Sequence, residues 1–394
     1  MADLLGISAL VIAVLVTFAI AVRHPSIAAV LLIAFTVRSA AALLHFYVSP
    51  LPDGTTDAIR FERYAWEWGQ DGLAAALSHF PGMDAYFYAW LMSLLYAMTD
   101  RSMLMLQAVN VLVGVLGVFL TWKLASELWG EKLGRKAAWV MALFPMVIQY
   151  GAIPLREAGF VLFFLLALLA VVRWQRHGGI VYLIGIFAGF IAASFFHGGA
   201  FVGLLAFLGV IGWRWGQQWV SGLARGRLRL AATLVVLLVA GAFAGYVLSG
   251  FSVHKLGTAE QMVSAERWMH YFDSRVYGGA RYPEWTQPQA PIDFIWALPV
   301  RAVYLMFAPF PWDLRDPAHV IGLLDGLFYL TLTFLIWRNR RVIWANPEAR
   351  MLLLILVPLI FAYGVGTGNF GTGLRHRAKF VGVFIILAAP RLPR

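Results

Sequence analysis

Two aspartates, Asp53 and Asp57, stand four residues apart in the polar stretch 49–84, which separates two long apolar regions. An ionised carboxylate within hydrogen-bond reach of an acceptor hydroxyl can act as a general base. The residues after Asp57 have the pattern of a short helix with Thr56 at its N-cap, and they place Asp57 on one stripe with Tyr64. The alternative is structural, because carboxylates stabilise the positive end of a helix. Asp57 is therefore the first candidate for a catalytic base, and Asp53 is the second.

A second polar cluster lies late in the chain, in the glycine-rich segment 364–377 that ends in Arg375, His376 and Arg377. Positions 366–371 match the G-x-G-x-x-G pattern, but no strand–helix–strand unit surrounds them, so a dinucleotide site is rejected. We expect a flexible external turn whose backbone N–H groups and arginines suit a phosphate or pyrophosphate. The alternative is an anchor at the membrane interface.

Further candidates combine charge with an apolar setting. Side chains that are costly in lipid are site candidates by default, and three stand inside apolar stretches: Arg38, His197 and Arg301. Arg301 could join the phosphate site. Arg156 and Glu157 follow a proline at the start of a predicted helix and could pair with each other or with substrate, and Arg60 lies beside Asp57. Each of these residues could instead have a structural partner.

No metal signature is present in the sequence. The nine histidines are scattered, and neither an HExxH motif nor an acidic calcium loop occurs. The absence of cysteine excludes thiol chemistry and Cys-ligated metal sites. We therefore predict no obligate cofactor, while a divalent metal remains an alternative.

These residues must be positioned by membrane helices. The chain has 394 residues, of which 61% are hydrophobic and 13% charged, whereas soluble domains have about 25% charged residues. At about 20 residues per span, this composition predicts an all-α polytopic protein with roughly nine to twelve transmembrane helices in one domain, 1–394. The predicted apolar runs lie near 4–22, 27–48, 85–99, 103–122, 137–153, 158–172, 179–196, 199–212, 230–249, 318–337, 351–367 and 378–390.

The net charge of +11 has a topological explanation. Basic residues collect in connections 173–177, 214–229 and 338–350, and cytoplasmic loops of membrane proteins are rich in Lys and Arg. This places 49–84, with its interfacial helices, and the two later loops 250–292 and 364–377 on the non-cytoplasmic face. A lipid bilayer is the predicted partner, and nucleic acid is not.

The first half of the chain also resembles a known superfamily over roughly residues 53–157. The resemblance rests on ordered groups: Asp57 with Tyr64-Ala65, Tyr86-Phe87-Tyr88 to Tyr96, Leu106-Gln107-Ala108-Val109-Asn110 with Gly114, Leu124-Ala125 to Gly130, and Ala137-Ala138 to Phe144-Pro145. This order is similar to the GT-C superfamily of polytopic glycosyltransferases, such as protein O-mannosyltransferases and lipid A aminoarabinose transferases. Stretches such as Pro-Phe-Pro-Trp and Arg-His-Arg also resemble envelope polysaccharide polymerases.

The resemblance implies an inverting sugar transfer from a polyprenyl-phosphate donor to a glycan, lipid or protein acceptor at the outer face of the inner membrane. The base would be Asp57, with Asp53 as the rival, and Arg375 and Arg377, with His376 nearby, would hold the leaving phosphate. Two alternatives stay open: a polymerase or ligase that uses polyprenyl-pyrophosphate oligosaccharides, and a transporter or flippase for such lipids.

Overall fold

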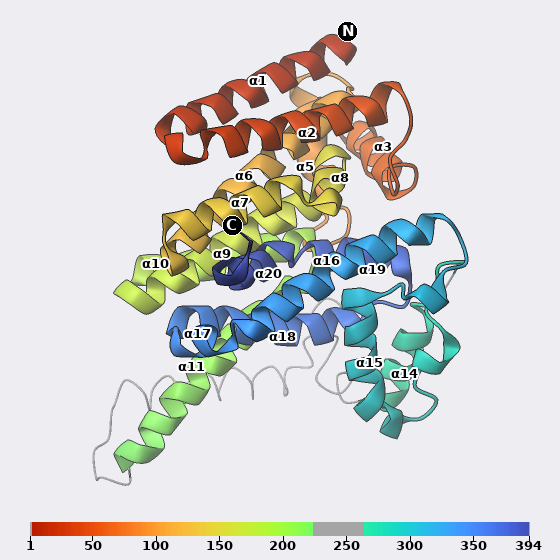
Figure 1. Ribbon diagram of the computed structural model, residues 1–394. Helices are drawn as coiled ribbons and strands as arrows, with labels where there is room; N and C mark the ends of the chain where they lie inside the picture. The colour runs from red at the N-terminus through yellow and green to blue at the C-terminus, as the bar shows by residue number, and fades with distance from the viewer. Residues whose placement is uncertain (1, 224–263, 277, 394) are drawn as a thin grey trace.

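The computed structural model describes residues 2–223, 264–276 and 278–393, which form a bundle of helices (Figure 1). Within these ranges no strand occurs, and a single antiparallel bridge joins Arg281 to Asn369. The α-helices are α1 (Ala2–Arg23), α2 (Ala28–Tyr47), α3 (Asp57–Gly69), α4 (Leu73–Ser78), α5 (Phe87–Met98), α6 (Met103–Trp129), α7 (Glu131–Leu143), α8 (Pro145–Ala152), α9 (Glu157–His177), α10 (Ile180–Phe196), α11 (Ala200–Leu223), α14 (Ala265–Asp273), α15 (Phe294–Phe307), α16 (Ala318–Arg338), α17 (Arg340–Ala345), α18 (Pro347–Val365), α19 (Phe370–Ala378) and α20 (Val381–Ala388).

Seven helices in the described part of the chain are long and apolar enough to cross a membrane. They are α1, α2 with the turn before it, α6, α9, α11, α16 and α18. Shorter apolar helices, α5, α10 and α20, pack among them. The prediction of an all-α polytopic membrane protein is confirmed. The predicted span 230–249 and positions 250–263 of the connection 250–292 lie outside the described residues.

The two ends of the bundle differ in composition. We call one the basic end: it contains the α9–α10 turn and α17, on the left of Figure 1. Arg176 near the end of α9 pairs there with Glu348 at the start of α18, at 2.9 Å. The opposite end, which we call the site end, contains α3, the α8–α9 junction and α19. The predicted basic connections 173–177 and 338–350 therefore lie together, away from the predicted site residues.

Helices α7 and α8 follow each other directly and are separated by a break at Phe144. Pro145 has no N–H, so the carbonyl of Met141 loses its usual helical partner. Arg38, fully buried on α2, donates to the carbonyls of Met141 and Ala142 at 3.2 and 3.0 Å. Arg38 is thus a structural residue that joins α2 to the end of α7.

The loop 49–84 forms the two short helices that the sequence predicts, α3 and α4. Thr56 occupies the N-cap of α3, but its side chain makes no capping hydrogen bond. The α3 helix packs against α5, where Glu62 is bound by Arg101 at 2.9 Å and by the Tyr96 hydroxyl at 3.1 Å. These contacts fix the helix whose first residue is Asp57.

The late segment 364–377 differs from the predicted flexible loop. Positions 370–378 form α19, because the Asn369 side chain accepts hydrogen bonds from the N–H groups of Gly371 and Thr372. A bonded N-cap of this kind favours helix formation in the residues that follow. Arg375, His376 and Arg377 therefore project from a helix in fixed and different directions.

Candidate active site

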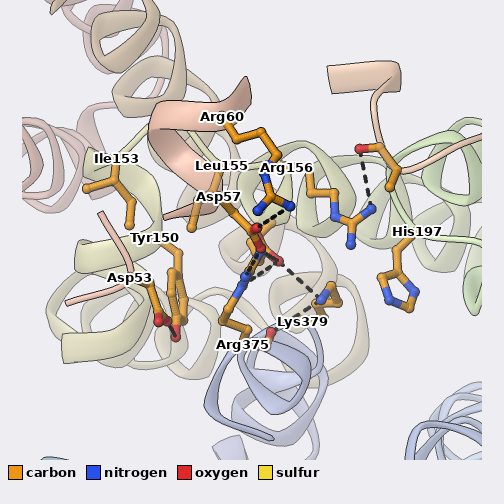
Figure 2. Close-up of polar contacts among 12 residues, drawn as sticks. Asp53, Asp57, Arg60, Tyr150, Ile153, Leu155, Arg156, His197, Arg375 and Lys379 are labelled. Carbon is orange, nitrogen blue, oxygen red and sulfur yellow. Dashed lines mark hydrogen bonds and ion pairs between the residues drawn. The ribbon is translucent and has the colours of Figure 1, made fainter. Parts of the chain in front are cut away.

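An ion-pair network joins three segments at the site end (Figure 2). Arg375 Nη1 on α19 lies 2.6 Å from Asp57 Oδ2 at the start of α3, and Arg375 Nη2 lies 3.3 Å from Glu157 Oε1 at the start of α9. Lys379 Nζ contacts the same Glu157 oxygen at 3.4 Å. The predicted acidic loop and the predicted arginine segment, 318 residues apart, are thus in direct contact.

The network is shielded from solvent at its centre and open at its edge. The side chains of Glu157 and Lys379 are 2% and 1% exposed, whereas that of Asp57 is 34% exposed. Burial alone would lower the pKa of Arg375, but the carboxylates around it outweigh burial and raise that pKa, so Arg375 stays charged. Burial lowers the pKa of Lys379 despite its contact with Glu157.

Asp53 is held in a strained backbone conformation. Its φ of 61° lies in the left-handed region, which few residues other than glycine adopt, although asparagine and aspartate enter it more readily than most. The Tyr150 hydroxyl donates to Asp53 Oδ2 at 3.0 Å, and the Gln149 amide donates to the carbonyl of Pro52 at 3.0 Å. Strained residues of this kind occur often at functional sites. Here α8 fixes both the backbone and the carboxylate of Asp53.

A cavity of about 780 Å³ opens beside Asp53. One wall comes from the first half of the chain and includes Asp53, Gln149 and Tyr150. The other wall comes from the second half, with Ala280, Arg281, Pro309, Arg315, Asp316, His319, Ile321, Gly322, Phe370 and Leu374 among its residues. The volume is within the usual range for ligand sites.

Burial raises the pKa of Asp53, and Arg375 and the Tyr150 hydrogen bond only partly oppose this rise. A carboxylate with a raised pKa in a cavity is a candidate base.

Arg156 adds a cation beside the ion-pair network, as Figure 2 shows. It is half-buried, its Nη1 makes one long contact of 3.5 Å to the Ala85 carbonyl, and its Nε is buried without a hydrogen-bond partner. Arg60 lies 3.7 Å from Asp57, with a side chain that is 52% exposed. The two arginines therefore add positive charge next to the neutral pairs that Arg375 and Lys379 make.

Two buried amides hold the backbone that leads into this site. Asn110 Nδ2 on α6 donates to the carbonyls of Ile153 and Leu155 at 2.5 and 2.9 Å, and Gln107 Nε2 donates to the carbonyl of Ala152 at 2.8 Å. These carbonyls belong to the last residue of α8 and to the connection between α8 and α9, where no helical N–H is present to satisfy them. Asn110 and Gln107 thus position the chain directly before Arg156 and Glu157.

Arg377 and Arg301, both predicted to bind phosphate, are instead enclosed by protein. Arg377 is fully buried: its Nε pairs with Asp325 at 2.6 Å, and its other nitrogens donate to carbonyls of α15 and its following turn, and of α16. Arg301 donates from Nη2 to the Thr367 carbonyl at 2.9 Å and lies over Phe272, 4.5 Å from the ring centroid, while its Nε and Nη1 are buried without a hydrogen-bond partner. Arg377 therefore joins α15 and α16 to α19.

The remaining predicted residues lie near the network but away from the cavity lining. His197 Nδ1 and the Tyr363 hydroxyl are 2.7 Å apart, and His376 Nδ1 lies 2.7 Å from the Thr367 hydroxyl. The His197 and His376 rings meet edge to face, with centroids 5.0 Å apart. Tyr64 instead packs against aromatic rings of α3 and of the turn before α5.

Several residues at this end of the bundle did not emerge from the sequence. Lys379 lies within the predicted apolar run 378–390, and an ionisable residue in such a position is a signal that could have identified it. Tyr150 lies within an apolar run and carries no such signal. Arg281, Arg315 and His319 are common residue types in loops, and only the cavity brings them together.

No family model matches the chain, and no curated protein or solved structure matches it. Within residues 2–223, 264–276 and 278–393, no group of three or more His, Cys, Asp or Glu side chains could hold a metal ion. The chemistry of the site must therefore be inferred from its own residues.

Proposed function

We propose that the protein transfers a sugar, with inversion, from a polyprenyl-phosphate donor to an acceptor of the cell envelope. The observation that carries the proposal is a carboxylate, Asp53, that lines a cavity and lies near an ion-pair network containing Arg375. Glycosyl transfer needs a base near the attacking hydroxyl and positive charge near the leaving phosphate. The two requirements match the two parts of this site.

Asp53 is the better placed of the two candidate bases. It lines the cavity, and its raised pKa brings it closer to the pH at which a base works best. Asp57 lies outside the cavity lining and is neutralised by Arg375 at 2.6 Å. In this assignment Asp57 orients Arg375. The carboxylate of Asp57 loses this partner only when Arg375 binds another anion.

The donor phosphate is assigned to the cations around Glu157. Arg60, Arg156 and Arg375 carry three positive charges against the two negative charges of Asp57 and Glu157. Lys379, whose pKa is lowered by burial, adds a further ammonium or amine donor beside Glu157. Arg375 would exchange Asp57 for a phosphate oxygen, and Arg156 has a guanidinium with little else to bind. Cations fixed in this way stabilise an anionic leaving group without reorganisation during the reaction.

The bilayer delivers the donor in this proposal. Ile321 of α16 lines the cavity and is also exposed on the outside of the bundle. A lipid tail could therefore lie against α16 while the head group enters from the side. The accumulation of arginines at the basic end favours a cytoplasmic position for that end, so the site end would face outward from the inner membrane.

The test is a transfer assay in nanodiscs with polyprenyl-phosphate sugars and extracted envelope acceptors, read out as sugar incorporated into the acceptor. We expect activity in the wild type, its loss in Asp53→Asn, and full activity in Arg341→Gln, an exposed arginine at the basic end that serves as the matched control. The proposal fails if the wild type transfers nothing in this assay while Asp53→Asn and Asp57→Asn, each expressed in a deletion strain, both restore the wild-type phenotype.

A further inference from the structure

The second wall of the cavity carries positive charge that the ion-pair network does not use. Arg281, Arg315 and His319 line the cavity from two segments of the second half of the chain, and Asp53 lines it from the first half. The cavity therefore has a carboxylate on one wall and a group of cationic or donor side chains on the other.

The backbone of this wall is fixed on both sides. The N–H of Tyr282 donates to the Gly368 carbonyl at 2.9 Å, and the N–H of Phe370 donates to the Ala280 carbonyl at 2.8 Å, so the residues that flank Arg281 are tied to the start of α19. The N–H of Arg315 donates to His319 Nδ1 at 3.2 Å. This contact makes Nδ1 the acceptor and leaves Nε2 of a neutral His319 as the N–H donor.

The guanidinium groups of this wall have few partners of their own. Among the described residues, Arg281 forms one ion pair, with Glu284 at 3.7 Å; both side chains are exposed, so this pair contributes little. Arg315 makes no ion pair with any residue in the described part of the chain. By contrast, the buried Arg377 uses each of its nitrogens on protein groups.

One carboxylate shares this wall and must be counted. Asp316 lies just before α16, where the positive end of the helix stabilises a negative charge. Asp313, outside the cavity lining, also interacts electrostatically with Arg315 and His319, and Glu284 lies near Arg281. The wall therefore carries both signs of charge, and Arg281 and Arg315 supply its guanidinium donors at the cavity.

We propose that Arg281, Arg315 and His319 form a subsite for an oxyanion group of the acceptor, a phosphate or a carboxylate. This inference rests on the proposed function, because a base at Asp53 requires the acceptor hydroxyl, and hence the acceptor, to occupy this cavity. The donor phosphate is held by the separate cluster around Glu157. The acceptor is therefore an acidic glycan or glycolipid whose negative charge lies across the cavity from its reacting hydroxyl.

Binding of small probes tests the subsite without any transfer reaction. Inorganic pyrophosphate, glucuronate and glucose are titrated into the full-length protein in detergent and followed by calorimetry. We expect one of the two anions to bind, glucose not to bind, and the double variant Arg281→Gln/Arg315→Gln to weaken anion binding by roughly tenfold or more, since bonds to charged groups are worth more than neutral ones. Arg341→Gln should bind like the wild type. The anion that binds distinguishes a phosphate from a carboxylate.

The outcomes separate this inference from the proposed function. Equal binding by the double variant and the wild type, or no binding of either anion by the wild type, overturns the subsite. Loss of binding in Arg375→Gln together with unchanged binding in the double variant places the anion at the donor cluster and also overturns it. Anion binding that depends on Arg281 and Arg315 in a protein without transfer activity supports the subsite and refutes the proposed function. Thermal unfolding of the variants should match that of the wild type, because both arginines are exposed or lie at the cavity surface.

Discussion

Replacement of Arg377 by methionine tests whether this residue binds substrate or stabilises the fold. The change keeps much of the side-chain volume and removes the guanidinium. It leaves the carboxylate of Asp325, which is 4% exposed, and three backbone carbonyls without their donor. Removal of one partner of a buried ion pair destabilises a protein by about 3–5 kcal/mol. We therefore expect Arg377→Met to lower the free energy of unfolding by at least this amount.

The measurement is thermal unfolding in detergent, followed by intrinsic tryptophan fluorescence. Arg341→Met, at an exposed position, is the matched control and should unfold like the wild type. The double variant Arg377→Met/Asp325→Leu should recover part of the lost stability, because it also removes the unpaired buried carboxylate. If Arg377→Met unfolds at the wild-type temperature but loses anion binding, Arg377 is a ligand-binding residue, and its proposed role in joining α15 and α16 to α19 is refuted.

Three further predictions concern the residues that support the site. The raised pKa of Asp53 keeps it protonated to a higher pH than an ordinary aspartate, so the transfer rate should rise as the pH increases through that higher pKa. Tyr150→Phe removes a hydrogen bond that lowers this pKa, so it should shift the rise in rate to still higher pH. A pH–rate profile that Tyr150→Phe leaves unchanged would contradict the assignment of Asp53 as the base. Asn110→Ala should destabilise the fold by about 1–3 kcal/mol for each carbonyl that it leaves unsatisfied, measured by thermal unfolding; wild-type stability would contradict this. Arg38→Met should destabilise the protein by a similar amount in the same measurement, with no specific effect on binding.

Part of the site could be predicted because topology alone brings it together. The apolar runs and the basic connections place the segments 49–84 and 364–377 at the same end of the bundle, and Asp57 and Arg375 do meet there at 2.6 Å. The difference between Arg375 and Arg377 could not be predicted in the same way. Side chains two positions apart on an α-helix are separated by a rotation of about 200° around the helix axis. The sequence of this segment, however, favours a flexible turn. Once α19 forms, one arginine faces Asp57 and the other faces Asp325.

Other residues escape prediction because their roles depend on a break in a helix. Asn110 and Gln107 lie inside an apolar run and have no local partner, and their amides become important only because α8 ends at Ala152. Likewise, Asp53 gains its raised pKa from burial that a linear pattern does not show. Hydrophobic periodicity predicts which segments cross the membrane, whereas the contacts at their interruptions are tertiary.

The contact between Arg38 and the break before Pro145 has a consequence for biogenesis. Ala142, whose carbonyl binds Arg38, lies 104 residues further along the chain. An arginine at the centre of a span costs about 2.5–3.5 kcal/mol on insertion, and during synthesis α2 must enter the bilayer before the carbonyls that offset this cost have been made. Within α2 itself, Arg38 has one such acceptor, the carbonyl of Ala34 at 3.1 Å. Its contacts with Met141 and Ala142 form only after α7 has been synthesised, so the final packing of α2 depends on a segment that is translated much later.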